Sequence, residues 1–278
     1  MRRRKNAFHP AGPTAQAVED AAEGNALLRG LNILREFRYG DQALSLAEIT
    51  RRSGLRKATV VKLVTTLEQE GFLVRLTGTE TYQPGLACAE LGHAWLESAT
   101  IARVARPAMR ELSSRYGMNV VLATPEHLDM ICIECCSHLI TSPTPALPGL
   151  SVPTTSTAIG RAWLWAQPRT VQGHVIEQTK VRRGESGSQS IPGLYRAFEE
   201  LEQHGYCYSA GEWQRHIIAV GTPVMLRNGA SFGLCGEVSA PGLLERYTRD
   251  ELGHGLVQAA RQIEFEAETS WISRTPVP

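Results

Sequence analysis

The stretch SLAEITRRSGLRKATVVKLVTTLEQEGF, Ser45 to Phe72, decides the fold of the N-terminal part of this chain. Ser45 and Glu48 have the spacing of a capping box, and Gly54 favours the left-handed conformation that ends a helix. We therefore expect one helix over 46–53 and a second over 56–70. Apolar residues recur at helical spacing along the inner face of the second helix, namely Val60, Leu63, Val64 and Leu67.

An apolar helix precedes this stretch and a hairpin follows it. The first of these is expected over 25–37, where Leu27, Leu28, Leu31, Leu34 and Phe37 form one apolar stripe. Residues 71–85, GFLVRLTGTETYQPG, predict two short strands joined at a Thr-Gly-Thr tip. Helix, helix, turn, helix and hairpin in this order are typical of a winged helix-turn-helix domain, which we place at residues 25–85.

Basic and hydroxyl side chains gather near the N-terminal end of the second of the two central helices. Lys and Arg neutralise DNA phosphates, and the N-terminal residues of a recognition helix contact base edges in the major groove. We expect Val61 to touch a thymine methyl group and Thr59 to bond a base or a phosphate. A solvated basic face is the alternative. The candidate DNA-binding residues are Ser45, Arg56, Lys57, Thr59, Val61, Lys62, Arg75, Thr77 and Thr79.

Charge is unevenly distributed, although the 278 residues carry a formal net charge of only +1. Residues 1–85 hold 13 Lys and Arg against 9 Asp and Glu, a net of +4, and the remainder holds 16 against 19, a net of −3. This asymmetry favours a basic module joined to a nearly neutral one. Residues 1–24 are rich in Arg, Pro, Ala and Gly without apolar periodicity, so we expect a disordered basic tail that solvates the N-terminus or adds phosphate contacts.

The composition, 42% hydrophobic and 21% charged, indicates a globular protein with a hydrophobic core. No apolar run approaches the roughly 20 residues that a membrane span needs. The basic N-terminus also lacks the apolar stretch of a secretory signal. We expect a cytoplasmic protein with no membrane partner.

The second half of the chain alternates helices with strands. Such a mixture, with helices beside an antiparallel sheet, predicts an α+β domain. The pattern predicts helices over 86–98, 103–116, 155–166, 191–203 and 252–271, and strands over 118–124, 128–136, 205–209, 217–225 and 231–239.

Three segments resemble the IclR family of bacterial transcription regulators. Residues 43–75, ALSLAEITRRSGLRKATVVKLVTTLEQEGFLVR, are similar to its DNA-binding segment. Residues 149–165, GLSVPTTSTAIGRAWLW, and 205–224, GYCYSAGEWQRHIIAVGTPV, resemble parts of its C-terminal domain. The resemblance covers about residues 25–270. It implies a winged helix-turn-helix, a linker helix over 86–100, and a GAF-like effector-binding α/β domain with an antiparallel sheet over 101–278.

The resemblance also implies a function. Regulators of this kind bind pseudo-palindromic double-stranded DNA as homodimers or homotetramers, and act as repressors or activators. A small-molecule effector in the C-terminal domain controls their DNA affinity. The effector expected here is a catabolic metabolite, an aromatic, carboxylic or hydroxylated compound.

The resemblance also implies an effector site, formed by the residues at the positions that match the family's pattern. Trp213 is added as a candidate lid over a ring-shaped ligand. Ala219 stands where many relatives have cysteine, and Glu237 stands where many have serine. The resemblance implies an effector site formed by Thr157, Ala158, Gly160, Glu212, Ala219, Glu237 and Ser239.

Glu237 changes the expected ligand chemistry. A carboxylate in the pocket repels an anionic effector unless a cation such as Arg161, Arg215 or His216 offsets it. It therefore favours a hydroxylated, amine-bearing or neutral ligand. The alternative is that Glu237 points outward to solvent.

Cys132, Cys135 and Cys136 supply ligand types that suit zinc or iron. In an extended strand, however, Cys132 and Cys136 share one face and Cys135 lies on the other, so one strand does not converge all three sulfurs. We expect no metal and no cofactor. Two alternatives stay open: a redox- or metal-sensing regulator that uses these cysteines, and a ligand-binding protein whose winged helix contacts other proteins.

Enzymatic motifs are missing from the sequence. It has no nucleophile elbow, no phosphate loop and no His-Glu-x-x-His. We therefore expect no enzyme activity and no catalytic residues.

Overall fold

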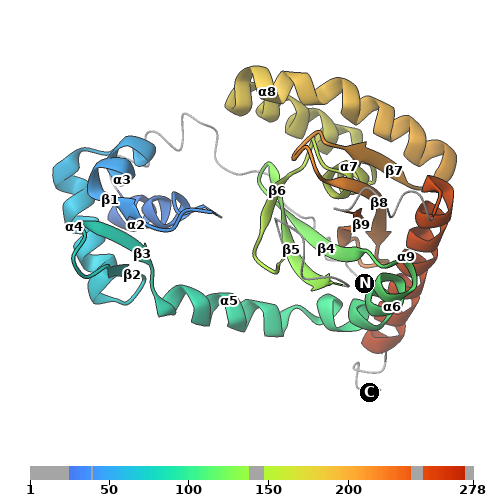
Figure 1. Ribbon diagram of the computed structural model, residues 1–278, viewed down its shortest axis with the longest axis horizontal. Coiled ribbons are helices and arrows are strands. Elements are labelled where there is room, and N and C mark those ends of the chain that lie inside the picture. The colour runs from blue at the N-terminus through green and yellow to red at the C-terminus, as the bar shows by residue number, and fades with distance from the viewer. Residues whose placement is uncertain (1–24, 39, 138–146, 239–246, 273–278) are drawn as a thin grey trace, which may run out of the picture. The chain divides into compact units, whose positions relative to one another are not determined.

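The computed structural model describes residues 25–38, 40–137, 147–238 and 247–272 (Figure 1). The chain divides into two compact units, the first ending at Ser98 and the second beginning at Ala99. The tail over 1–24, predicted to be disordered, and the candidate effector contact Ser239 lie outside the described residues.

The first unit is a winged helix-turn-helix, as the sequence predicts. Its described helices are α2 (Ala26–Arg35), α3 (Leu46–Ser53), α4 (Lys57–Gln69) and α5 (Leu86–Ser98). Its antiparallel sheet has the order β1 (Leu44–Ser45), β3 (Thr81–Pro84) and β2 (Leu73–Arg75). The two-residue strand β1 was not predicted, because it is too short to show a period of alternation.

Local capping fixes the turn between α3 and α4. The Ser45 hydroxyl accepts a hydrogen bond from the Glu48 amide at 3.2 Å, which is one half of the predicted capping box. The Glu48 carboxylate, expected to reach the Ser45 amide, accepts instead from Arg51 and Arg52. Gly54 ends α3 with a φ of 66°, the left-handed conformation that glycine adopts without strain.

One small core holds this unit together. It joins the inner faces of α2, α3 and α4 to the sheet, which fixes the angle at which α4 is presented. Its buried members are Ile33, Leu44, Ile49, Val60, Val64, Leu73 and Tyr82.

The second unit is an antiparallel six-stranded sheet with helices on both faces. The strand order is β6 (Ser151–Pro153), β5 (Asp129–Cys136), β4 (Asn119–Glu126), β9 (Ser231–Val238), β8 (Ile218–Met225) and β7 (Cys207–Ala210). One face carries α6 (Thr100–Tyr116) and α9 (Arg249–Ile272), and the other carries α7 (Ala158–Trp165) and α8 (Arg169–His204) (Figure 1). This is the α+β, GAF-like domain that the sequence predicts.

The structure corrects two of the predicted helices. The helix predicted over 155–166 begins only at Ala158, because the Thr157 side chain caps it by accepting from the Gly160 amide. The helix predicted over 191–203 is the second half of α8, which kinks at Gly184. Its polar first half lacks the regular apolar stripe that helix prediction needs. Strand β6 was also missed.

Two glycines let α7 lie directly on the sheet. A Cβ on Gly221 of β8 would stand 2.4 Å from the Ala158 carbonyl oxygen, and one on Gly233 of β9 would stand 2.4 Å from that of Ile159. Only glycine allows so close an approach of helix and sheet backbones. The start of α7 is therefore held against β8 and β9.

Among the residues that the structure describes, no helix combines the length and the hydropathy needed to cross a bilayer.

Candidate nucleic-acid interface and ligand pocket

The outer face of α4 gathers exposed cations that are unpaired among the described residues of the first unit. Arg56, Lys57 and Lys62 are exposed, and no described acidic residue pairs with any of them. Val61 is also exposed, whereas Thr59 is only half-exposed beside the core residue Val60. The outward face thus presents cations around one small apolar side chain.

Thr65 belongs to the same face and was missed by the sequence analysis. It is exposed and lies three residues after Lys62 and four after Val61, a spacing that puts it beside both on a helix. Its hydroxyl donates to the Val61 carbonyl at 2.9 Å. Its spacing from Lys62 and Val61 was the signal in the sequence that could have placed Thr65 on this face.

Two other cations of this unit are used within its own fold. Arg52 pairs with Asp41 at 2.6 Å and with Glu48 at 2.8 Å, and it donates to the Glu36 carbonyl at 2.9 Å. Arg51 pairs with Glu48 at 2.6 Å. These contacts tie α3 to the end of α2, so Arg51 and Arg52 are less available to a partner than the cations of α4.

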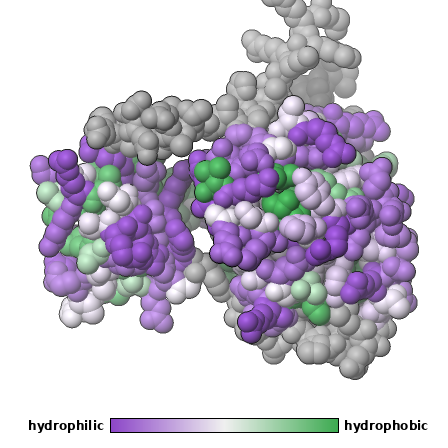
Figure 2. Space-filling view, turned by 90° about the horizontal axis from the view of Figure 1, so that it is seen from above, coloured by the Kyte–Doolittle hydropathy of each residue, from purple (hydrophilic) through white to green (hydrophobic). Residues whose placement is uncertain are grey.

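The remaining candidate DNA contacts lie at the hairpin and at the start of α3. Arg75 of β2 forms an ion pair with Glu80 across the hairpin. Thr77 and Thr79 are exposed at its tip, and the Thr79 hydroxyl lies 2.6 Å from that of Thr81. The Ser45 hydroxyl is already used as the cap of α3. Hydrophilic residues cover most of the face of this unit in view in Figure 2.

A pocket opens in the second unit, on the face of the sheet that carries α7. It measures about 550 Å³, counted out to its open mouth. Its walls come from all six strands of the sheet, from Leu150 just before β6, from the start of α7 and from the loop over residues 211–217. The lining residues are Val121, Cys132, Leu150, Val152, Thr157, Ala158, Ile159, Ser209, Glu212, Trp213, Gln214, Ile217, Ala219, Cys235 and Glu237.

The predicted effector residues separate into three groups. Six of them line this one pocket, although they lie far apart in the sequence: Thr157, Ala158, Glu212, Trp213, Ala219 and Glu237. Gly160 is not among the lining residues. It packs on the Thr154 backbone, where a Cβ would stand 2.3 Å from the carbonyl oxygen. Ser239 lies outside the described residues.

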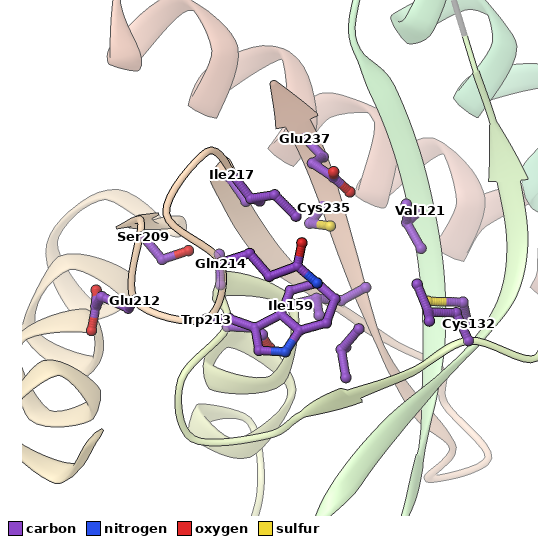
Figure 3. Close-up of a pocket in the computed structure, with 15 residues that line it drawn as sticks. Val121, Cys132, Ile159, Ser209, Glu212, Trp213, Gln214, Ile217, Cys235 and Glu237 are labelled. Atoms are coloured by element: carbon purple, nitrogen blue, oxygen red, sulfur yellow. The ribbon is translucent and has the colours of Figure 1, made fainter. Parts of the chain in front are cut away.

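An ion pair between the buried Arg161 and the partly exposed Glu212 holds the loop over residues 211–217. The Arg161 side chain is 1% exposed, and its two terminal nitrogens donate to the Glu212 carboxylate at 2.9 and 2.5 Å. Its Nε donates to the Thr155 carbonyl at 2.9 Å. Figure 3 shows the Glu212 carboxylate pointing away from the pocket, whereas Trp213 and Gln214 lie across it. Glu212 therefore positions the loop.

Glu237 is buried in the wall of the pocket, so the alternative that it faces solvent is wrong. The residue is 8% exposed, and its Oε1 has no hydrogen-bond partner among the described residues. Burial raises the pKa of this carboxyl from 4.5 to about 7.

None of the cations considered for Glu237 lies beside it. Arg161 is taken by Glu212, and Arg215 and His216 are exposed residues outside the pocket lining. No Lys, Arg or His is among the described residues that line the pocket. An anionic ligand would therefore meet an uncompensated carboxyl group.

The cysteines occupy different faces from those predicted. Ala123 pairs with Cys132 and Leu122 with Glu134, so Ile133 forms a bulge that shifts the alternation of β5 by one residue. Cys132 and the half-buried Cys135 therefore pack on the α7 side of the sheet, and Cys136 packs on the α6 side. The prediction that Cys132 and Cys136 share a face was wrong.

The environment of these thiols favours neither metal nor redox chemistry. Burial raises the pKa of Cys132 to about 12 and that of Cys135 to about 11, so both stay protonated at neutral pH. The described residues contain no group of three or more His, Cys, Asp or Glu side chains placed to hold a metal ion.

The winged helix-turn-helix and the pocketed GAF-like domain define a transcriptional regulator with a sensor domain. Family models agree with this architecture. The IclR helix-turn-helix domain matches residues 26–77, and the C-terminal domain of the bacterial transcriptional regulator IclR matches residues 93–265. The chain belongs to the IclR family, whose members are transcriptional regulators and not enzymes.

Individual relatives cover nearly the whole chain. The HTH-type transcriptional regulator TsaQ1/TsaQ2 of Comamonas testosteroni is 27% identical over 95% of this chain and 97% of its own. The transcriptional repressor IclR of Escherichia coli is 26% identical over 93% and 94%. The crystal structure of an IclR family regulator from Brucella abortus superposes with a TM-score of 0.79, at 28% identity over 90% of this chain and 95% of the other.

A further solved structure holds a ligand. An IclR homologue from Microbacterium hydrocarbonoxydans, in complex with 4-hydroxybenzoate, has a TM-score of 0.69 and 20% identity over 88% of this chain and 100% of the other. At this identity the match shows the shared fold alone.

Proposed function

We propose that this protein binds a pseudo-palindromic DNA operator in a sequence-specific manner, and that a small molecule in the pocket of the second unit sets its DNA affinity. The observation that carries the proposal is the outer face of α4, where Arg56, Lys57 and Lys62 are exposed and unpaired among the described residues. Cations that the fold does not use are available to neutralise phosphates.

The proposed contacts follow the position of each side chain on α4 and the hairpin. Arg56 and Lys57 lie at the N-terminal end of α4, the part of a recognition helix that reaches base edges and phosphates. Val61, Lys62 and the added Thr65 follow on the same face. Thr59, Arg75, Thr77, Thr79 and Ser45 take supporting roles at the backbone.

The proposed effector is a small, largely apolar metabolite of the aromatic or hydroxylated kind. The lining supports this, since most of it is aliphatic, aromatic or thiol, with Trp213 lying across the space (Figure 3). The relative from Microbacterium hydrocarbonoxydans holds an aromatic compound, 4-hydroxybenzoate. Its carboxylate would be disfavoured here, because no Lys, Arg or His is among the described residues that line the pocket with Glu237.

The proposed coupling uses the domain organisation predicted from the sequence, with 25–85 binding DNA, 86–100 linking and 101–278 sensing. A ligand changes DNA affinity only if it binds the DNA-competent and incompetent arrangements unequally. In this proposal α5 carries that difference. The scheme accommodates either repression or activation, and it places the regulator in the cytoplasm with its DNA.

A homodimer is part of the proposal, with the homotetramer as a further assembly. Helix α5 has no buried residue in the described chain, yet Leu86, Leu91 and Trp95 are 80%, 60% and 48% exposed. Leu27 and Leu31 of α2 are exposed as well. Apolar surface of this kind favours association of two copies, and two copies read two half-sites.

A gel shift across salt concentrations tests the function. The full chain should bind a fragment of its own upstream DNA more tightly than a scrambled fragment. The logarithm of the binding constant should fall linearly with the logarithm of the salt concentration. Failure to bind any promoter fragment at low salt, with or without small molecules, would overturn the proposal. That outcome would favour the alternative in which the winged helix contacts proteins.

The redox- or metal-sensing alternative has its own test. One metal atom per chain in the purified protein, or DNA affinity that changes on mild oxidation and recovers with a thiol reductant, would support it. The raised thiol pKa values of Cys132 and Cys135 predict neither outcome.

A further inference from the structure

The pocket holds a buried carboxyl group that the fold does not satisfy. Glu237 lies on β9 between Asn119 of β4 and Ala219 of β8, its register partners. It is more than nine-tenths buried, and its Oε1 has no hydrogen-bond partner among the described residues. A buried polar atom without a hydrogen-bond partner costs free energy. A ligand that supplies the partner removes this cost and therefore binds more tightly.

Two other polar lining residues, Thr157 and Glu212, are already used within the protein. The Thr157 hydroxyl donates to the Pro153 carbonyl at 2.6 Å and accepts from the Gly160 amide at 3.3 Å. Glu212 is held by Arg161 and points away from the space (Figure 3). Glu237 is thus the one acidic lining residue, among those the structure describes, without a cation.

Among the residues that the structure describes, the titratable groups that interact electrostatically with Glu237 do not offset its charge. They are the thiols of Cys132 and Cys135 on β5 and of Cys235 on β9. Burial raises the pKa of each thiol, so all three stay neutral when the carboxyl ionises. An ionised Glu237 therefore leaves one net negative charge in an otherwise apolar wall.

We propose that the effector is a small apolar amine whose protonated nitrogen pairs with Glu237 while its hydrocarbon body fills the space beneath Trp213 and Gln214. This inference rests on the proposed function of the same pocket. An ammonium group supplies both the missing donor and the missing positive charge. A hydroxyl group supplies only the donor, and a carboxylate adds a second anion.

Three probes of similar shape test the chemical class of the effector: benzylamine, benzyl alcohol and benzoate. Isothermal titration of the full chain at pH 8 should rank benzylamine first and benzoate last, with about tenfold or more between the amine and the acid, the size of one charge-assisted contact. Benzoate binding as tightly as benzylamine, or no detectable binding of benzylamine at millimolar concentration, would overturn the proposal.

The pH dependence gives a second readout. Benzylamine stays protonated between pH 6 and pH 8, whereas Glu237, with a pKa of about 7, goes from mostly neutral to mostly ionised. Affinity for benzylamine should therefore rise about tenfold across this range, following the ionised fraction of one group. Affinity that is flat or that falls with rising pH contradicts the ion pair.

A matched pair of variants measures the contribution of the Glu237 charge to binding. Glu237→Gln keeps the shape and removes the charge, so it should weaken benzylamine binding about tenfold and change benzyl alcohol binding by less than about threefold. Glu111→Gln makes the same change on an exposed site of α6 and should leave all three probes unaffected. Unchanged benzylamine affinity in Glu237→Gln, with its thermal unfolding intact, would remove Glu237 from the site.

Gel shifts with the same preparations keep the two proposals separate. Retained promoter binding without benzylamine binding overturns the amine class and leaves the regulator function standing. Benzylamine binding without any promoter binding overturns the regulator function and leaves the ligand class standing.

Discussion

Glu237 combines two roles that oppose each other. Its position at the pocket wall suits a ligand contact, but its burial costs stability whenever the group is ionised, because a charge without a partner loses its hydration. The raised pKa is the measure of that cost. Residues of this kind are common at functional sites, where binding takes precedence over stability.

The folded protein should therefore lose stability as pH rises through the Glu237 titration. The folded pKa of about 7 lies above the ordinary value of 4.5, so the native state binds the extra proton between these two values. The contribution is present at and below pH 4.5 and is lost by pH 7, a change of about 3 kcal/mol at about 1.4 kcal/mol per pH unit. Urea unfolding of the wild type at pH 5 and pH 8 measures it.

Glu237→Gln is the matched variant for this titration. It should unfold with a smaller fall in free energy between pH 5 and pH 8, because the amide does not titrate, while Glu111→Gln should behave like the wild type. Identical pH profiles for Glu237→Gln and the wild type would contradict the buried titration.

The exposed cations of α4 lead to a prediction about DNA affinity at the scale of single residues. Lys57→Ala and Lys62→Ala should each lower affinity for all DNA sequences, and each should reduce the slope of log affinity against log salt by about 1, since one phosphate contact is lost. Lys180→Ala is the control, because Lys180 pairs with Glu177 in the second unit. An unchanged salt slope in both variants would show that α4 does not lie along a duplex.

At the scale of elements, α7, α8 and the loop over residues 211–217 meet at the Arg161–Glu212 pair. Gly193 of α8 leaves the room for this pair: a Cβ there would stand 2.5 Å from the Glu212 Oε2 and 2.6 Å from the Arg161 Nη2. The pair fixes the loop that carries Trp213 into the pocket. Loss of the Glu212 carboxylate would be costly, because it would leave the buried Arg161 charge without its partner.

Gly193→Ala should loosen the loop without changing a charge. The added methyl group displaces the carboxylate or the guanidinium, so we expect a loss of about 1–2 kcal/mol in the free energy of unfolding, a typical cost of overpacking. Acrylamide should also quench the tryptophan fluorescence more strongly, because Trp213 becomes more accessible.

Gly173→Ala is the control for that change on the same helix. A Cβ at Gly173 meets nothing within 4 Å, so alanine should leave stability unchanged or raise it by up to about 1 kcal/mol, as alanine is the better helix former. Equal effects at the two glycines would show that the ion pair does not depend on Gly193.

At the scale of the whole molecule, the proposed homodimer forms through the exposed apolar side chains of α5. Leu91→Lys together with Trp95→Lys should shift the protein from dimer to monomer at micromolar concentration, because burying lysine in an apolar interface is unfavourable. Light scattering coupled to size exclusion measures the mass. Operator affinity should fall with it, since a monomer reads one half-site.

The control for this change is Val181→Lys, at an exposed apolar position of α8 in the second unit. It should leave the dimer mass unchanged. A dimer that survives both lysines on α5 would place the interface elsewhere.

Much of the first unit could be predicted from local signals. Ser45 and Gly54 mark the ends of α3 within the sequence itself, and the apolar spacing from Val60 onward sets the inner face of α4. The second unit was less predictable. The bulge at Ile133 moved Cys136 to the opposite face, and the polar first half of α8 carried no periodic signal.

The sequence by itself determined the family, the order of the elements and the cations of α4, because caps, turns and periodicity act between residues a few positions apart. Only the tertiary structure decided that Glu237 is buried in the pocket wall with no cation among the described lining residues, that Arg161 is taken by Glu212, and that Gly160 stays outside the pocket. The physical reason is that burial and charge pairing depend on which distant segments exclude water from a side chain, and a local pattern does not contain that information.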